Sequence, residues 1–278
     1  GCTTAPGTRA EVSSSQSQAA LAKGQPERAI TLAEAAVLAE PHSSAYRAEL
    51  GSAYLQAGRF ASAVTAFEDA MSLGETSPRT ALSLAVALMG QGRMDEAGSL
   101  LTQWEDRIPA ADLGLALALA GKADRGVYVL GNAIRSGQND VKVRQNLAYA
   151  YALAGRWREA QLMAAQDLAG KQLDDRIELW ARMAHPDASQ ARVAGLLGVP
   201  TSVADPGQPV QLALANTPSV AQLAAEASPP VPVPIAEELP PLASVAAPAV
   251  TVPAIKSAPP EPLVLQAPAL AEPSAPTS

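Results

Sequence analysis

The chain has 278 residues, of which 48% are hydrophobic, 4% aromatic and 17% charged, and its formal net charge is −7. This mild negative charge, with basic residues scattered along the sequence, argues against a nucleic-acid partner and against electrostatic docking on an anionic membrane. The sequence holds no apolar run of the roughly 18 residues that a membrane-spanning helix needs, so it predicts none.

The single cysteine of the chain is its second residue, Cys2, and it follows Gly1. A glycine directly before a cysteine resembles the end of a bacterial lipoprotein signal peptide, where that cysteine is lipidated. The resemblance implies a lipidated tether at residues 1–9, anchored through acyl chains on Cys2. Thr3 and Thr4 then favour the outer membrane, because inner-membrane retention commonly uses an aspartate after the cysteine. The alternative is a chain that begins beside a cysteine by coincidence.

Glycines recur at a nearly constant interval in the sequence after the tether. Gly24, Gly58 and Gly92 are equally spaced. The next interval, which ends at Gly121, is shorter, and the one that ends at Gly155 returns to the first length. Each glycine lies between two stretches with apolar residues at helical spacing, so the pattern predicts a series of helical hairpins.

The unit at residues 44–77 has the most complete pattern. Its marker residues are Leu50, Gly51 and Tyr54 on the first helix, and Ala63 and Phe67 on the second. This pattern and its period of about 34 residues resemble the tetratricopeptide repeat, with Arg47 where that family most often has tryptophan. The resemblance implies an all-α solenoid of about five helical hairpins that is a non-catalytic scaffold for a protein or peptide partner and needs no cofactor.

The first and fourth units depart from this pattern. The first, residues 10–43, has a weak first helix, as expected of a terminal repeat with one solvated face. The fourth, residues 111–140, is shorter by about five residues, which we assign to its first helix. A helix so shortened leaves a gap in the wall of the array or changes its curvature. Trp104, just before this unit, is expected to pack between helices rather than face a partner.

Two more helices are expected after the fifth unit, at residues 174–183 and 188–199. They would cover the apolar end of the array, with Trp180 packed into that end. With these capping helices, the superhelical domain spans residues 10–198.

The remaining sequence, residues 199–278, changes character. It holds 18 of the 24 prolines and no aromatic residue, so it cannot form a packed core and is expected to be a disordered Pro/Ala-rich tail. Such a tail is a semi-rigid spacer. The alternative for residues 229–234 is a polyproline ligand for a partner.

The sequence contains no recognisable catalytic or metal-binding motif. His42 and His185 have no cysteine or carboxylate at metal-ligand spacing, and both precede or follow a proline in a predicted loop. Phosphate-binding glycine loops and nucleophile-elbow motifs are also missing. We therefore expect neither enzymatic activity nor a bound metal.

The candidate site is the inner surface of the solenoid, which the first helices line. Residues off the helix-pairing face are expected to form a peptide-binding groove: Ala45, Ala48, Ser52 and Leu55; Arg79, Leu82, Val86 and Met89; and Lys142, Gln145, Asn146 and Tyr149. Some tetratricopeptide proteins clamp a carboxylate with lysine and asparagine here, but this chain has that pair only once. The groove therefore favours an apolar helix or an extended peptide. The alternative is that several of these residues pack against neighbouring repeats.

Two functions are compatible with this organisation. A lipidated cysteine before a repeat array, with the segment Ser189–Val193 after it, resembles the lipoproteins of the Tad (Flp) pilus system. That resemblance implies an outer-membrane lipoprotein facing the periplasm that assists pilus or secretion machinery assembly. The alternative is a structural adaptor linked to peptidoglycan or the envelope, whose Pro-rich tail is a spacer. A cytoplasmic co-chaperone is disfavoured by Cys2 and by the incomplete clamp.

Overall fold

The computed structural model describes residues 8–185, 188–200 and 203–214. Within these ranges all regular secondary structure is helical, with twelve α-helices and one short 3₁₀-helix, η2. The helices are α1 (Arg9–Ala22), α2 (Pro26–Ala39), α3 (Ser44–Gln56), α4 (Phe60–Ser72), α5 (Pro78–Gly90), α6 (Met94–Gln103), α7 (Ala110–Leu119), α8 (Ala123–Arg135), α9 (Val141–Leu153), α10 (Trp157–Ala164), α11 (Lys171–Met183), α12 (Ser189–Leu197) and η2 (Val210–Leu212).

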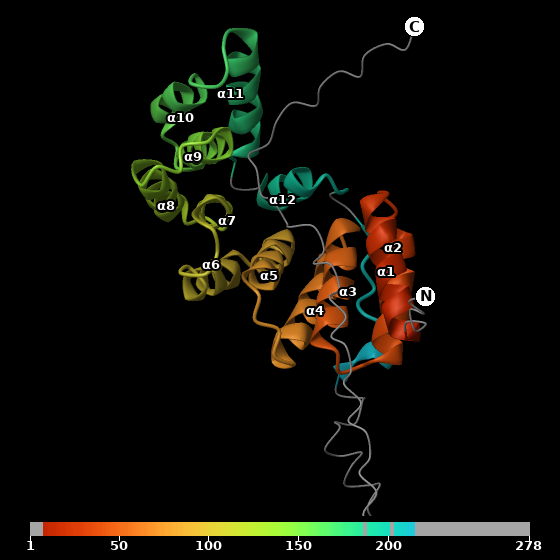
Figure 1. Ribbon diagram of the computed structural model, residues 1–278. Coiled ribbons are helices and arrows are strands. Elements are labelled where there is room, and N and C mark those ends of the chain that lie inside the picture. Colours follow the sequence, from red (N-terminus) through yellow and green to blue (C-terminus); the bar gives the residue numbers. More distant parts are fainter. Residues whose placement is uncertain (1–7, 186–187, 201–202, 215–278) are drawn as a thin grey trace, which may run out of the picture.

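The first ten helices form five antiparallel hairpins that stack in chain order along a curved array (Figure 1). The five predicted glycines all lie in the turns within these hairpins, with φ between 66° and 80°, a backbone conformation in which any side chain would be strained. Each turn glycine therefore ends a first helix and lets the second helix fold back. The predicted solenoid of five repeats is confirmed.

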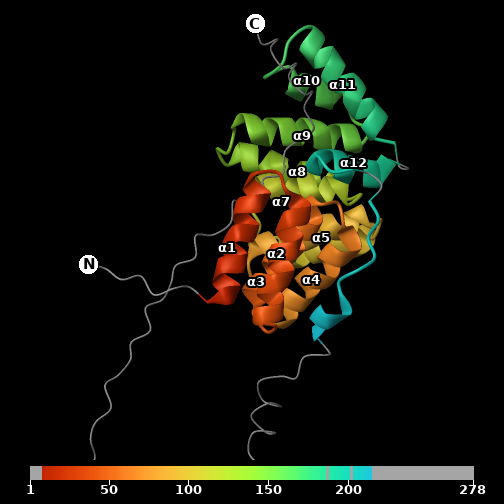
Figure 2. The ribbon, with the colours of Figure 1, turned by 90° about the vertical axis from the view of Figure 1, so that its right-hand side faces the viewer.

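The inner side of the curve holds the first helices and the C-terminal helix α12. Figure 1 shows α12 inside the curve, where it packs against α5 and α7. The second view shows α12 beside the ends of the central helices (Figure 2). Helix α5 is buried on every side, because all its residues from Thr80 to Gly90 are buried. A helix that is apolar all round must be covered all round, and α12 supplies part of that cover.

The shortening of the fourth unit is distributed differently from the prediction. Helices α6 and α7 have 10 residues each, whereas α3, α4 and α5 have 13, so the second helix of the third unit loses as much as the first helix of the fourth. The reason is Trp104, which caps the end of α6 and is buried there, as predicted. The Arg107 guanidinium lies 4.3 Å from the centre of its ring. Helix α6 therefore ends about one helical turn earlier than α4, the second helix of the preceding unit.

The end of the array agrees with the sequence prediction. Trp180 of α11 is fully buried, with its ring 5.3 Å from that of Tyr149 on α9. Helix α12 ends at Gly198, which has a left-handed backbone. These helices close the apolar end of the array.

The boundary of the predicted tail is too early. The sequence predicts disorder from residue 199 onward, yet residues 203–214 pack on the second and third helices of the array and on α4. They are ordered because Asp205 and Leu212 find specific partners there, which composition does not reveal. The rest of the predicted tail, with its polyproline stretch, lies outside the described residues, as does Cys2. In the part of the chain that the structure describes, no helix is long and apolar enough to cross a membrane.

Close helix packing predicts a contrast between two glycines of α8. A Cβ on Gly126 would lie 2.4 Å from the Gly114 carbonyl oxygen, whereas a Cβ on Gly131 would meet only the flexible Arg135 side chain, at 3.4 Å. Gly126→Ala should therefore lower the free energy of unfolding by about 1–3 kcal/mol. Gly131→Ala should leave it unchanged or raise it by up to about 1 kcal/mol, through better helix propensity. Urea denaturation followed by circular dichroism measures both, and equal effects would contradict this packing.

Candidate peptide-binding site

The predicted inner groove is partly filled by the chain itself. Leu82, Val86 and Met89 of α5 are all buried. Val193 of α12 belongs to the same apolar cluster as these side chains. A helix with an apolar face thus already occupies this part of the groove, which is the helix-in-groove arrangement expected of a ligand.

Three further predicted groove residues are buried as well. Leu55 packs in the core of α3. The Asn146 side-chain amide donates a hydrogen bond to the Ala111 carbonyl oxygen, 3.0 Å away. The Tyr149 ring packs on Trp180, and burial raises the pKa of its hydroxyl above the ordinary value. These side chains hold neighbouring helices together, in line with the packing alternative.

The remaining predicted residues keep contact with solvent, and all but Ser52 lie in the N-terminal halves of the first helices. Ala45 is exposed, and the half-buried ones are Ala48, Ser52, Arg79, Lys142 and Gln145. The Lys142 ammonium is 2.7 Å from Asp112 Oδ1 on α7. Its charge is therefore already paired, which argues further against a carboxylate clamp. These residues are the part of the predicted groove that stays in contact with solvent.

A second occupied surface lies on α2, α3 and α4. We call residues 203–214 the strap. Val199, Pro200 and Val203 pass closely over the turn at Gly58, within 3.2–3.5 Å of the position that a Cβ there would take. The chain thus leaves the inner face around the edge of the third and fourth helices. It then continues past α4 and α3 to η2, which contacts α2.

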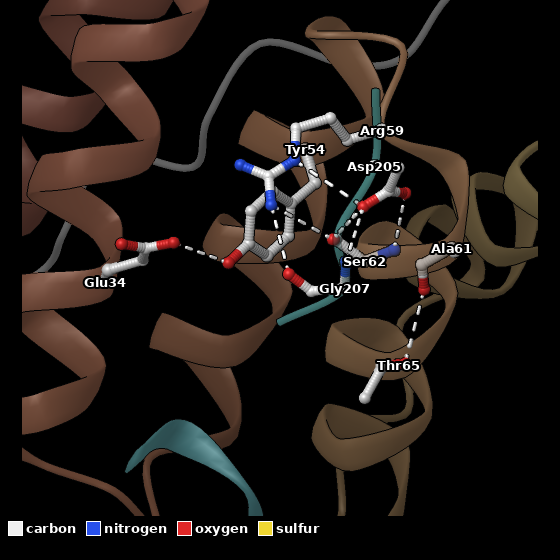
Figure 3. A network of polar contacts seen from close by, with 8 residues as sticks. All are labelled: Glu34, Tyr54, Arg59, Ala61, Ser62, Thr65, Asp205 and Gly207. Carbon is white, nitrogen blue, oxygen red and sulfur yellow. Dashed lines mark hydrogen bonds and ion pairs between the residues drawn. The ribbon is translucent and has the colours of Figure 1, made fainter. Parts of the chain in front are cut away.

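Asp205 fixes the strap to the start of α4 (Figure 3). The N-cap of α4 is Arg59, whose side chain has only donors and cannot accept from the free N–H groups of the first turn. The Asp205 carboxylate takes that role: it accepts from the Ser62 backbone N–H at 3.0 Å and from the Ser62 hydroxyl. A residue far away in sequence therefore caps this helix, where negative charge is also favoured by the helix dipole.

The environment of Asp205 favours its ionised form. Burial works against the charge, but hydrogen bonds from the Ser62 hydroxyl and from three backbone N–H groups outweigh it and hold the pKa of Asp205 below the ordinary value. The guanidinium of Arg59 lies close by, with Nε 3.6 Å from Asp205 Oδ1. The carboxylate is therefore charged at neutral pH.

Arg59 joins the strap to the helices beneath it. Its guanidinium lies 4.7 Å from the centre of the Tyr54 ring and donates to the Gly207 carbonyl oxygen at 3.1 Å. The Tyr54 hydroxyl in turn donates to Glu34 of α2 at 2.7 Å. Figure 3 shows these side chains converging from α2, α3, α4 and the strap.

Arg47 holds the other end of the strap. Its fully buried guanidinium donates to Asp69 at 2.6 Å, to the Pro41 carbonyl at 2.8 Å and to the Leu212 carbonyl at 3.0 Å. Burial lowers the pKa of Arg47, and the neighbouring Asp69 partly offsets that effect. Leu212 itself is buried. The array thus binds the strap as it would an extended peptide, through two backbone carbonyls, one carboxylate and one apolar anchor.

Sequence reasoning missed the residues that hold the strap. Asp205 and Leu212 stand in a proline-rich stretch whose composition indicates disorder. One signal was present: Arg47 occupies a position where the repeat family most often has a buried aromatic residue. A buried arginine needs acceptors, and here they are Asp69 and two carbonyl groups.

The described residues contain no group of three or more histidine, cysteine, aspartate or glutamate side chains that could hold a metal ion.

Comparison with known families agrees with the hairpin architecture. Tetratricopeptide repeat models match residues 15–78 and 54–119. No curated protein sequence matches significantly.

Several solved structures resemble the array. MamA from Desulfovibrio magneticus RS-1 is 20% identical, with 58% of this chain and 94% of that chain covered, at a TM-score of 0.49. PilF of Pseudomonas aeruginosa is 17% identical, over 68% of this chain and 89% of the other, at 0.47. YrrB, described as a tetratricopeptide protein with an unusual peptide-binding site, is 16% identical over 62% and 88%, at 0.45.

The strap contacts predict a local effect of removing one carboxylate. Asp205→Ala should expose the first turn of α4, at a cost of about 1–2 kcal/mol, because its N–H groups lose their acceptor. Hydrogen exchange at Ser62 and in the strap should then be faster by about tenfold or more. Gln211→Ala, at an exposed strap position, should change exchange little.

The difference in unfolding free energy between the wild type and Asp205→Ala should depend on pH. Because the pKa of Asp205 is lowered by folding, its contribution is present above the unfolded-state value of about 3.9 and is lost as the pH falls through the folded value. The stability difference between wild type and Asp205→Ala should therefore be constant near neutral pH and shrink below about pH 4. A difference that persists unchanged at pH 2 would contradict the capping role.

Proposed function

We propose that this tetratricopeptide repeat protein is a non-catalytic scaffold that holds protein partners. Tetratricopeptide arrays offer extended surfaces for protein–protein contacts. The observation that carries the proposal is that the array already holds two segments of its own chain as ligands. Helix α12 lies on the inner face and the strap lies across α2, α3 and α4. Both are modes in which such surfaces bind peptides from other proteins.

The partner site that we propose is the open half of the inner groove. It is lined by Ala48 and Ser52 of α3 and by Gln145 of α9, which stay half-buried beside the segment that α12 covers. Small and uncharged side chains leave room for an apolar helix or an extended peptide. Leu82 and Tyr149 are buried, so substitutions there would test folding rather than binding.

The groove proposal predicts loss of a partner from a double variant. Ser52→Arg with Gln145→Arg places two long cations in the open half of the groove and should reduce crosslinked partner by about tenfold or more, because their burial against an apolar ligand is costly. Crosslinking and pull-down from envelope membranes measure the recovery. The control is Thr31→Arg with Ser99→Arg, at exposed positions of the second helices. Equal recovery from both double variants would show that the partner binds elsewhere.

We further propose a place for this scaffold in the cell envelope. Gly1-Cys2 before a repeat array favours a lipoprotein of the outer membrane that faces the periplasm and assists assembly of a pilus or secretion machine. The alternative is a structural adaptor of the envelope. It is favoured by the Pro/Ala-rich composition of residues 215–278, which suits a spacer.

The envelope proposal predicts acylation of Cys2. When the full-length precursor is expressed with a labelled fatty acid, label should enter the protein and partition with outer membranes, whereas a Cys2→Ser variant should remain unlabelled. Absence of label from the wild type would remove the basis for the lipoprotein. Co-sedimentation of the unlabelled protein with purified peptidoglycan would then favour the adaptor.

A further inference from the structure

An open cavity lies at the shortened fourth unit, on the same side of the array as the strap. Its volume is about 400 Å³, and it lies between the α6–α7 connection, the start of α7 and one face of α8. The unit is the one whose shortening predicts either a gap in the wall of the array or a change in its curvature. The walls of the cavity include Ile108, Ala110, Leu113, Arg125 and Tyr128.

This cavity is the equivalent, two repeats on, of the surface that binds the strap. Gly58 and Gly121 are the corresponding turn glycines. When positions are counted from these two glycines, Ala110 corresponds to Arg47, which binds the Leu212 carbonyl. Arg125 corresponds to Ser62, which binds Asp205. The positions that hold an extended segment in the second repeat therefore line an open cavity in the fourth.

The substitutions between the two repeats define the ligand chemistry. Ala110 leaves empty the space that the Arg47 side chain fills, so an apolar side chain can enter between Ile108 and Leu113. At the start of α8 the N-cap is Lys122, which has only donors, and Arg125 follows in the first turn. An acidic residue of the ligand would meet Arg125 and the positive end of the α8 dipole there, against the opposing charges of Glu105 and Asp106 in the lining and Asp124 in the first turn of α8. Arg125 now pairs with Glu105 at the surface, an interaction that is easily exchanged.

We propose that this cavity binds residues 261–270 of the same chain. Glu261-Pro262 and Ala269-Leu270 stand at the same spacing as Asp205-Pro206 and Ala213-Leu214 of the strap. The segment thus offers an acid for Arg125 at one end and leucines for the space beside Ala110. It differs from the strap at the position of Leu212, where it has Pro268, so Leu270 is the apolar anchor.

The chain between the two segments is long enough. Residues 215–260 separate them, and a Pro-rich chain of about 46 residues can reach up to about 140 Å at roughly 3.1 Å per residue. The strap ends at η2 beside α2, and the six helix-to-helix steps from α2 to α8 cover at most about 60 Å at roughly 8–10 Å each. The tail can therefore reach the cavity in the same molecule. This site is separate from the inner groove of the proposed function and does not depend on it.

A photo-crosslinker in the full-length chain tests the proposal. Benzoylphenylalanine replaces Tyr128, which is 61% exposed at the rim of the cavity, or Leu162, which holds the same repeat position on α10 and is 64% exposed. We expect position 128 to crosslink within one chain to residues 261–270, and position 162 to give at most about a tenth of that yield. Peptide mass spectrometry identifies the crosslinked segment.

Two variants probe the chemistry of the same crosslink. Arg125→Glu should lower its yield by about fivefold or more, since it repels Glu261 and disturbs only a surface ion pair. Ala110→Trp should abolish the crosslink, because the indole ring fills the cavity. Circular dichroism shows whether this variant folds. If it does not fold, the result for Arg125→Glu decides. The proposal is overturned if position 128 captures no tail peptide, captures any part of the tail as readily as position 162 does, or crosslinks only to a second chain.

Discussion

Close contact between helices at residues with little or no side chain sets the geometry of this array. The Cβ that Gly51 lacks would lie 2.7 Å from the Phe67 ring, and Gly114 and Gly126 place two backbones against each other. Short helices such as α3 and α7 are marginal on their own, so their stability comes from this packing. The turn glycines give every hairpin the same reversal of direction, so the close packing of two helices recurs along the chain. The stacked hairpins therefore form a curved array with two faces.

The inner face shows the consequence of an apolar helix at the centre of the array. Helix α5 is buried all round, so the face that it would present to the groove needs a permanent cover. The chain supplies it in α12, and the residues expected to line an open groove become core residues. The partner site proposed above is therefore placed at inner-face residues that α12 leaves in contact with solvent.

The strap shows how such an array binds extended chain. A buried arginine is stable only where acceptors surround it, and Arg47 finds them in Asp69 and in carbonyl groups of two segments. The fifth repeat contains a similar arrangement. There Arg144 pairs with Asp167, and the Arg156 guanidinium lies 4.6 Å from the centre of the Tyr151 ring. The array thus repeats a set of donors that is suited to backbone carbonyls and carboxylates, and the strap uses one copy of it.

The sequence by itself determined the hairpins, their turns and the irregular fourth unit. Those features depend on local spacing: glycines that must adopt positive φ, and apolar residues at helical intervals. It also placed Trp104 and Trp180 in the core correctly.

Only the tertiary structure decided what covers the two faces. Whether Leu82 lines a groove or lies in a core depends on the position of α12, which comes far later in the chain, and nothing local to α5 encodes it. The strap is the same case. Asp205 and Leu212 stand in a sequence with too little apolar surface to fold alone. They become ordered because they bind to the start of α4 and to the buried Arg47 of the second repeat. Long-range pairing of this kind depends on the assembled array, so local pattern could not reveal it.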